Sequence, residues 1–310
     1  MPDRKDVFKK LNETKRLPTP SSTTMEVIRL CQSDSTSLND IATVIQTDPA
    51  LSAELLRYAN AAFLSTGIQV ASIHKATVKL GMKTVVNVAL GFSLLSSNKK
   101  GKCRTFNYEK FWSSSLLQAI AAKSIASLGE EFDPEELFVC GLLANMGQLA
   151  LASLFPEQYE AILTKIGFQP LDEPDGSRHV RKFMEKDTFQ IDSSELVLEL
   201  FLDWGLPAHY ALAAGYYDDL DNGELGTGRT KQIAKILYTA QQISTICMDS
   251  NATRERLSTI EKIAKKAGVN ETVFWLLFDS IITQWYDWGE IFKIRTSQCA
   301  SYGSIMGNQT

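Results

Sequence analysis

Apolar residues recur along this chain with the spacing of helices that bury one face. In the clearest example, the residues at i, i+3, i+4 and i+7 are Leu38, Ile41, Ala42 and Ile45. Helix-start signals accompany the pattern, namely a capping box of Ser37 with Asp40 and N-caps at Asp48, Asp133 and Asp192. The alternation typical of strands is not convincing anywhere before residue 291. The pattern therefore predicts an all-α fold.

Breaks in the apolar pattern divide the chain into two helical lobes. A polar and basic stretch at 96–104 separates a first lobe at 17–98 from a second at 105–290 that includes the C-terminal helices. We predict an N-terminal lead at 1–16 and a tail or linker at 291–310, where the periodicity lapses. The stretch 218–230 is rich in Gly and Asp, so we predict a solvated loop there, with Asp218 and Asp219 exposed to water.

One stretch, 137–156, carries no charged residue and is long enough to raise the question of a membrane span. It contains Asn145 and Gln148, and its flanks carry Glu135, Glu136 and Glu157 instead of basic anchors. We therefore predict the central helix of a soluble bundle. The charged N-terminus lacks the apolar core of a signal peptide, so we expect a cytoplasmic protein without membrane contact.

Composition limits the chemistry that this chain can perform. The three histidines, His74, His179 and His209, are far apart, and the five cysteines are odd in number and form no CxxC pair. These features argue against a zinc cluster and against a disulfide framework. No nucleophile elbow or phosphate-binding loop is present. A formal net charge of −4 gives the whole molecule no attraction to nucleic acid.

The segment 72–96 has the spacing of a helix-turn-helix, with a break at Gly81. DNA recognition needs basic and amide side chains on the exposed face of the second helix, whereas this helix is almost wholly apolar. We predict a buried helical hairpin. A DNA-binding regulator that uses this segment and the basic run at 99–104 is an alternative.

Motifs spread over 17–217 resemble the HDOD domain, a bacterial signalling module related to the HD-type metal phosphohydrolases. The matching stretches are LPTPSSTTMEVIRL at 17–30, SLNDIATVIQTDPALSAELLRYANAAF at 37–63, SIHKATVKLGMKTVVNVAL at 72–90, GLLANMGQLAL at 141–151 and WGLP at 204–207. Each stretch is weak alone, but their order and spacing are specific together. The resemblance implies an HD-like helical bundle with two lobes.

The resemblance also marks the positions at which the related hydrolases bind metal. Their adjacent His-Asp pair falls at Ala144 and Asn145, and the lysine that often follows falls at Gln148. Further histidine positions are matched, approximately, by Ser114, Ser193, Tyr217 and Asp218. Methyl, hydroxyl and amide groups are poor ligands for a divalent cation. We therefore expect no metal, no other cofactor and no hydrolytic activity.

Two interpretations of this degenerate site stay open. In the first, Ser114, Asn145, Gln148 and Ser193 line a pocket that hydrogen-bonds a small ligand. In the second, each of these side chains is satisfied inside the bundle, as buried polar groups usually are.

The resemblance implies a non-catalytic regulatory domain that acts by binding proteins, with a small ligand as a further option and a cyclic-dinucleotide or similar output. HDOD domains occur alone or joined to receiver, diguanylate cyclase (GGDEF) or phosphodiesterase (EAL) modules, which are the expected partners. We predict a partner surface in the most distinctive motif, formed by Arg57, Tyr58, Asn60 and Phe63. The competing hypothesis is a divergent HD-type metal-dependent phosphohydrolase with ligands that the motifs do not reveal.

Overall fold

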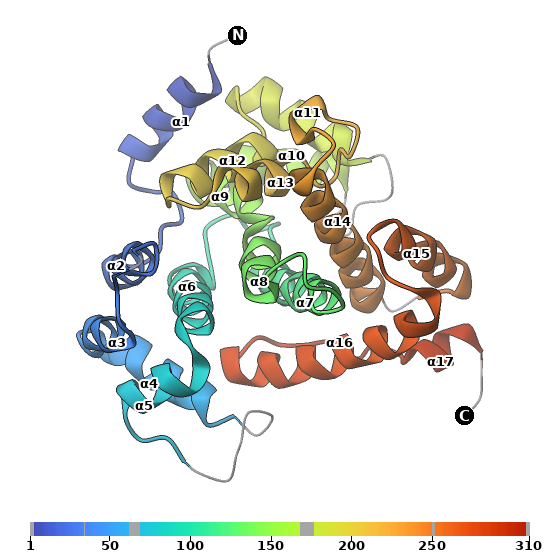
Figure 1. Cartoon of the computed structure of the whole chain (residues 1–310). Coiled ribbons are helices and arrows are strands. Elements are labelled where there is room, and N and C mark those ends of the chain that lie inside the picture. Colours follow the sequence, from blue (N-terminus) through green and yellow to red (C-terminus); the bar gives the residue numbers. More distant parts are fainter. Residues whose placement is uncertain (1–2, 34, 62–68, 168–176, 250–251, 308–310) are drawn as a thin grey trace.

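The chain folds into helices joined by short connections (Figure 1). The computed structural model describes residues 3–33, 35–61, 69–167, 177–249 and 252–307, and no strand occurs in these ranges. The predicted all-α fold is therefore confirmed.

The helix-start signals read from the sequence are present as capping contacts. Ser37 and Asp40 form a capping box at α3, and Asp192 forms another with Glu195 at α12. Asp48 and Asp133 accept hydrogen bonds from the first backbone N–H groups of α4 and α8, and each of these helices starts with a proline. Local sequence therefore sets where these helices begin.

The first lobe consists of five helices, and the last two of them form the predicted hairpin. They are α2 (Ser22–Cys31), α3 (Leu38–Gln46), α4 (Pro49–Ala59), α5 (Ile73–Leu80) and α6 (Met82–Asn98). The chain turns by 113° between α5 and α6 at Gly81. Val85, Val88 and Ala89 of α6 are fully buried, so the helix that resembled a DNA-recognition helix is a core helix, as predicted.

The centre of the second lobe consists of apolar helices that other helices surround. These central helices are α7 (Tyr108–Ala126), α8 (Pro134–Leu143) and α9 (Met146–Leu154). The stretch Pro134–Leu154 is apolar enough to cross a membrane, but 94% of its most apolar window is buried inside the protein. It also breaks into two helices at Ala144 and Asn145. The burial agrees with the central helix of a bundle.

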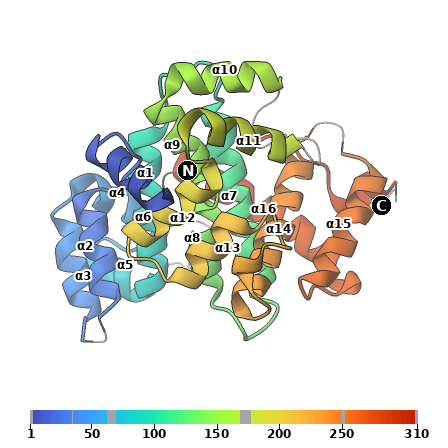
Figure 2. The same ribbon diagram turned by 90° about the horizontal axis from the view of Figure 1, so that it is seen from above.

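The remaining helices of the second lobe enclose this centre (Figure 2). They are α10 (Pro156–Ile166), α11 (Ser177–Phe189), α12 (Ser193–Asp203), α13 (Ala208–Tyr216), the 3₁₀ helix η2 (Gly223–Leu225), α14 (Arg229–Met248) and α15 (Arg254–Lys266). The N-terminal helix α1 (Arg4–Glu13) packs on α12, where Arg4 Nε lies 2.6 Å from Glu199 Oε1. The predicted N-terminal lead is thus a helix attached to the second lobe.

A long helix, α16 (Glu271–Phe292), runs along both lobes and joins them (Figure 1). The ring of Trp288 lies 4.7 Å from the ring of Tyr58 in α4 and 4.8 Å from that of Phe138 in α8. The buried apolar residues of the two lobes form one continuous cluster. The lobes therefore share a core instead of folding around separate ones.

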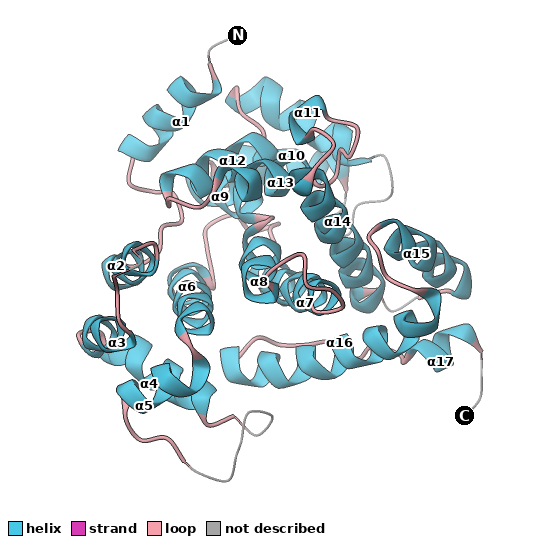
Figure 3. Cartoon of the chain, in the orientation of Figure 1, coloured by secondary structure: helices cyan, strands magenta, loops and turns pink. Residues whose placement is uncertain are grey.

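The segment predicted as a tail packs against the body. After α16 the chain turns back as a loop (Figure 3). Ser113 Oγ donates a 2.8 Å hydrogen bond to the carbonyl of Arg295 in this loop. Ile294 is 8% exposed. A last short helix, α17 (Tyr302–Met306), is fixed by a 2.7 Å hydrogen bond from the backbone N–H of Tyr302 to Asp279. Residues 291–307 are therefore part of the folded unit.

Candidate functional site

The structure brings most residues of the predicted degenerate site around one small cavity, which we call the polar pocket. Its lining comprises Ala144, Asn145, Gln148, Ser193, Tyr217 and Asp218, together with Arg178, Arg181, Lys182 and Ser194. These residues come from the α8–α9 junction, α11, the start of α12 and the end of α13. The cavity measures about 10 Å³, which is room for about one water molecule.

Close backbone contact at two glycines makes this arrangement possible. A Cβ atom at Gly147 in α9 would lie 1.8 Å from the carbonyl oxygen of Ser193, where α12 begins. A Cβ at Gly141 in α8 would lie 2.7 Å from the Cα of Ala119 in α7. Both glycines belong to the stretch 141–151 that carried the family resemblance. In this protein that stretch brings α9 close to α12 beside the pocket, and α8 close to α7 behind it.

Asn145, which the resemblance matches to a metal-binding aspartate, is held in a chain of hydrogen bonds. The Tyr217 hydroxyl donates to Asn145 Oδ1 at 2.9 Å, and Asn145 Nδ2 donates to Gln118 Oε1 at 2.7 Å. Gln118 Nε2 in turn donates to the carbonyl of Leu237 in α14 at 3.4 Å. Burial raises the pKa of Tyr217 to about 12, so its hydroxyl keeps the proton that it donates. Both the oxygen and the nitrogen of the Asn145 amide are therefore engaged within the protein.

Ser114 does not belong to the pocket that the resemblance predicted for it. Its hydroxyl lies 2.8 Å from that of Ser244, and the Ser244 hydroxyl also approaches the Ser114 carbonyl at 3.1 Å. These contacts join α7 to α14, and Ser114 is absent from the pocket lining. Ser114 thus fits the second interpretation, in which the side chain is satisfied inside the bundle.

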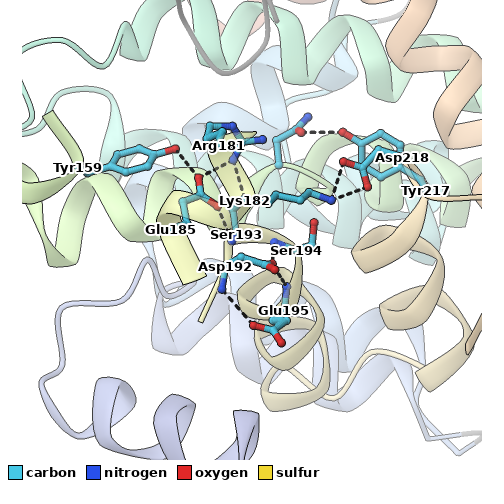
Figure 4. Close-up of polar contacts among 11 residues, drawn as sticks. Tyr159, Arg181, Lys182, Glu185, Asp192, Ser193, Ser194, Glu195, Tyr217 and Asp218 are labelled. Carbon is cyan, nitrogen blue, oxygen red and sulfur yellow. Dashed lines mark hydrogen bonds and ion pairs between the residues drawn. The ribbon is translucent and has the colours of Figure 1, made fainter. Parts of the chain in front are cut away.

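A buried ion pair closes one side of the polar pocket (Figure 4). Arg181 Nη1 lies 2.5 Å from Glu185 Oε1, and these side chains are 2% and 0% exposed. The same Arg181 nitrogen donates to Ser193 Oγ at 2.7 Å, while Glu185 Oε2 accepts from the backbone N–H of Ser193 at 2.9 Å. Tyr159 adds a 3.2 Å hydrogen bond to Glu185. The pair is therefore tied to the start of α12 through both its charges.

A second ion pair joins Lys182 to Asp218, with 2.7 Å between Lys182 Nζ and Asp218 Oδ2. The prediction that Asp218 is solvated in a loop is wrong, because its side chain is only 9% exposed. Burial alone would raise the pKa of Asp218, but the charges of Lys182, Arg178 and Arg181 outweigh it and hold the pKa below its ordinary value. The carboxylate is therefore ionised and held by cations.

Asp192, at the edge of the same region, has the opposite electrostatic environment. Its side chain caps α12 by accepting from the backbone N–H groups of Ser194 and Glu195. Burial raises the pKa of Asp192, and the neighbouring charges of Glu195 and Glu185 add to this rise. The pKa values of these two nearby aspartates are therefore shifted in opposite directions, so their contributions to the pH dependence of stability have opposite signs.

Sequence reasoning missed the residues that supply most of the charge in the pocket. In the stretch 177–186 only His179 was singled out from the sequence, and it is exposed. Arg181 and Glu185 nevertheless point inward, while Val180 and Phe183 are 55% and 73% exposed. The spacing of Arg181, Glu185 and the buried Phe189 at i, i+4 and i+8 was the available signal, because these positions share one helix face.

A second hollow, which we call the interlobe groove, lies between α2 and α6 of the first lobe and α8 and α13 of the second. It measures about 240 Å³, and its apolar lining includes Ile28, Cys31, Met82, Val86, Leu90, Val139, Leu206 and Pro207. The polar groups of the lining are engaged with one another. Asn87 Nδ2 donates to Glu135 Oε2 at 2.7 Å, and Glu136 accepts from the Tyr210 hydroxyl. The groove has space but few polar groups that are available to a ligand.

The residues predicted as a partner surface make contacts within the protein. Arg57 pairs with Glu54 and donates to the carbonyl of Ile291. Tyr58 is 2% exposed, so it belongs to the core and not to a surface. Asn60 clamps the backbone of Val70 with two 2.8 Å hydrogen bonds. Phe63 lies outside the described residues. These contacts give the motif a role in packing the first lobe and attaching it to α16.

Comparison with known proteins identifies the family to which this architecture belongs. The model of the HDOD domain matches residues 17–220. This chain is a member of the HDOD family. A curated relative, an uncharacterised protein of Treponema pallidum (strain Nichols), is 25% identical over 146 residues. That alignment covers 46% of this chain and 27% of the relative, so the chain spans about a quarter of the relative's length.

Solved structures of HDOD-like proteins share the fold. An HDOD domain protein of unknown function from Geobacter sulfurreducens has a TM-score of 0.71 at 18% identity, covering 93% of this chain and 99% of its own. A proposed phosphohydrolase from Shewanella amazonensis SB2B also has a TM-score of 0.71, at 24% identity over 93% of this chain and 97% of its own. The MmoQ response regulator of Methylococcus capsulatus (Bath) is 32% identical with a TM-score of 0.51, covering 84% and 97%. The HDOD assignment made from the motifs is confirmed.

The polar pocket does not fit the divalent metal site of the related hydrolases. Its uncharged donors are amide and hydroxyl groups, and its one carboxylate, Asp218, is paired with Lys182. Three cationic side chains, Arg178, Arg181 and Lys182, line the same small space and would repel a metal cation. In the part of the chain that the structure describes, no three His, Cys, Asp or Glu side chains come together as a ligand set.

Proposed function

We propose that this HDOD protein is a non-catalytic regulatory protein that acts in the cytoplasm by binding another protein. The observation that carries the proposal is the pair of ion pairs, Arg181 with Glu185 and Lys182 with Asp218, in the region that the resemblance matches to the metal site of the related hydrolases. A hydrolase of this type needs a cation that is open to water and to phosphate. Here the cationic charge belongs to side chains whose carboxylate partners already satisfy it.

The lack of free space supports the same conclusion. A phosphate ester is many times larger than the one water molecule that about 10 Å³ holds. Entry of such a substrate would require the Lys182–Asp218 pair to separate and α11 to move. Breaking a buried ion pair leaves an uncompensated charge, which costs several kcal/mol.

The outer face of α11 supports a binding role. Val180 and Phe183 are exposed on the same helix whose inner face carries Arg181 and Glu185. Exposed apolar side chains that lie together on one helix face, as these do at i and i+3, can mark a contact surface. We therefore favour the outer face of α11 over residues 57–60 as the partner surface, because the latter are occupied in internal contacts.

The expected setting is bacterial signal transduction. The similarity to a response regulator supports this setting. We propose that the output is a receiver, diguanylate cyclase or phosphodiesterase module, either joined to the HDOD domain or separate from it. The free state of all five cysteines is compatible with the reducing cytoplasm.

The absence of catalysis can be tested on the purified protein. We expect less than stoichiometric Mn, Fe, Ni, Co or Zn by elemental analysis, and no hydrolysis of bis(p-nitrophenyl) phosphate when each metal is added. Stoichiometric metal together with metal-dependent turnover would refute the proposal and support the phosphohydrolase alternative. A titration with duplex DNA at low salt tests the remaining alternative, a DNA-binding regulator, and we expect no salt-dependent binding.

The binding role needs a variant that changes the surface without changing the fold. We expect the double substitution Val180→Ser and Phe183→Ser to abolish capture of a cytoplasmic partner that the unchanged protein retains. Trp275→Ser is the matched control, because Trp275 is an apolar side chain on α16 that is 45% exposed. Loss of capture with the Trp275 variant alone would place the partner surface on α16 instead.

A further inference from the structure

A cationic hollow lies where the end of α6, the start of α7 and the loop after α16 meet. It measures about 340 Å³, which is within the size range of ordinary small-ligand sites. We call it the basic hollow, because the described residues that line it include Lys99, Lys100, Lys293 and Arg295 but one carboxylate, that of Glu109. The resulting excess of three positive charges contrasts with the formal net charge of −4 of the whole chain.

Most of this positive charge is not neutralised within the protein. Lys99 Nζ donates to the carbonyl of Lys293 at 2.9 Å, which is a contact with an uncharged group. Arg295 Nε lies 3.7 Å from Glu109 Oε1, and these side chains are 84% and 59% exposed, so water weakens their attraction. Among the residues that the structure describes, no carboxylate pairs with Lys100 or Lys293. Two cations of the polar pocket, in contrast, are paired with buried carboxylates. The charge of the basic hollow is therefore available to an anion from solution.

The same hollow has an apolar and aromatic part. Leu95, Trp112 and Ile294 are buried and line it together with the half-buried Tyr108, whereas the cationic side chains are exposed. The indole N–H of Trp112 donates to the carbonyl of Asn98 at 3.1 Å, which fixes the orientation of the ring. Exposed cations around an apolar floor suit an anion that carries an apolar body.

Contacts between distant segments fix the walls of the basic hollow. The rings of Phe92 in α6 and Phe292 in α16 stack with 4.4 Å between their centroids (Figure 1). The 2.8 Å hydrogen bond from Ser113 to the carbonyl of Arg295 holds the loop after α16 on α7. The two basic segments that meet here lie 194 positions apart in the sequence, and one of them belongs to the basic run at 99–104. The site is therefore formed by the fold itself, which lowers the entropy cost of binding.

The backbone at Lys293 has a conformation that lysine rarely adopts. Lys293 ends α16 with φ 53° and ψ 42°, in the left-handed region. Glycine is the usual residue at this position of a helix end, because it has no Cβ atom to clash there. A cation near a helix end also complements the helix dipole, but an exposed position in the last turn would supply it without this conformation. The strained backbone therefore favours a role for the Lys293 side chain in the basic hollow.

We propose that the basic hollow binds a small phosphate monoester with an aromatic body. The phosphate, which carries about two negative charges at neutral pH, meets the ammonium groups of Lys100 and Lys293, and the ring lies on the apolar floor beside Tyr108 and Trp112. An extended nucleic acid fits less well, because Trp112 is 2% exposed and cannot project between the bases of a strand. The ligand contacts the segment between the lobes, α7 and the loop after α16, and stabilises them in one arrangement. This site goes beyond the regulatory function proposed above and does not depend on its partner.

Calorimetric titration of the full-length protein at low salt tests the proposal with matched probes. Naphthyl phosphate carries both the charge and the ring, naphthol carries only the ring, and inorganic phosphate carries only the charge. We expect naphthyl phosphate to bind at least about tenfold more tightly than either of the others, and its binding to weaken as the salt concentration is raised. Equal binding of inorganic phosphate would indicate an adventitious ion only. That result, equal binding of naphthol, or no binding of naphthyl phosphate would overturn the proposal.

Lys293→Gly separates ligand binding from folding. It removes one cation and places glycine where the backbone is left-handed, so we expect the thermal stability to be kept or raised while the affinity for naphthyl phosphate falls. Combined with Lys100→Gln, it should weaken binding at least about tenfold. The matched control is Lys9→Gln with Lys10→Gln, which removes the same charge from exposed positions of α1 outside the basic hollow and should bind normally. Unchanged affinity in the first double variant, or equal losses in both, would contradict the site.

Two further probes distinguish the source of the ligand. Tighter binding of AMP than of naphthyl phosphate would identify a nucleotide, and weaker binding would identify another aromatic phosphate, so both results keep the site. A single-stranded DNA oligonucleotide that displaces naphthyl phosphate at a lower concentration of phosphate groups than AMP would assign the surface to nucleic acid and refute the proposal. None of these titrations involves partner capture by α11, so their failure would leave the proposed regulatory function in place.

Discussion

The polar pocket and the interlobe groove differ in what each offers to a ligand. The polar pocket gathers cations, a carboxylate, amides and hydroxyls, but it has room for about one water molecule. The interlobe groove has about 240 Å³ of space, but its lining is mostly apolar and its polar groups bind one another. The polar pocket has suitable polar groups but no room for a ligand, and the interlobe groove has room but few available polar groups. The loss of catalysis that we propose would therefore involve the filling of a site as well as the loss of its ligands.

The largest effect should come from separating the charges that fill the polar pocket. Glu185→Ala leaves the guanidinium of Arg181 buried without its partner, so we expect a loss of about 3 to 5 kcal/mol in unfolding free energy. Urea denaturation monitored by circular dichroism measures it. The double variant Arg181→Met with Glu185→Leu should recover most of this loss, because no buried charge remains. A single variant as stable as the unchanged protein would show that the pair does not hold the pocket closed.

Close backbone packing at the pocket predicts the next largest effect. Gly147→Ala places a methyl group 1.8 Å from the carbonyl of Ser193, and neither backbone can move far within the bundle. We expect a loss of about 3 kcal/mol in unfolding free energy. Gly129→Ala is the matched control, since nothing lies within 4 Å of its added Cβ, and it should be nearly neutral. Equal stability of both variants would contradict the close approach of α9 and α12.

Acid should reveal the different environments of Asp218 and Asp192. The pKa of Asp218 is lowered in the fold, so its contribution to stability is present above its ordinary pKa and is lost as the pH falls through the folded value. Asp218→Asn should lose about 2 kcal/mol at neutral pH and show a weaker acid dependence below pH ~4. In the control Asp192→Asn we expect the unfolding free energy at neutral pH to change with the opposite sign, because the raised pKa of Asp192 makes its ionisation unfavourable in the fold. Thermal unfolding across this pH range distinguishes them, and parallel profiles would refute the assignment.

The smallest effect should come from filling the interlobe groove. Val86→Phe adds volume where about 240 Å³ is open, so we expect stability to change by less than about 1 kcal/mol. Ala144→Phe adds the same kind of side chain to the polar pocket, where only about 10 Å³ is open, and should clearly lower the unfolding free energy. The comparison fails if both substitutions have the same effect in thermal denaturation.

Much of the fold was predictable because helix starts and apolar periodicity are local properties. Ser37 and Asp48 cap the helices that their positions predicted, and α6 is buried because it is apolar on nearly every side. The motifs also predicted correctly that Asn145, Ser193 and Tyr217 would lie together. Ser114 was placed in the pocket but lies outside it, and Asp218, which does line the pocket, was wrongly expected to be solvated. Their contacts, with Ser244 and Lys182, come from segments that no local pattern associates with them.

The sequence by itself determined the helices and their order, because both depend on residue type at known positions. Only the tertiary structure decided which way α11 faces. Packing against α12 turned Arg181 and Glu185 inward and left Phe183 in solvent, contrary to the usual preference of an isolated amphipathic helix. Contacts between distant segments depend on the whole packed arrangement, which local sequence does not encode.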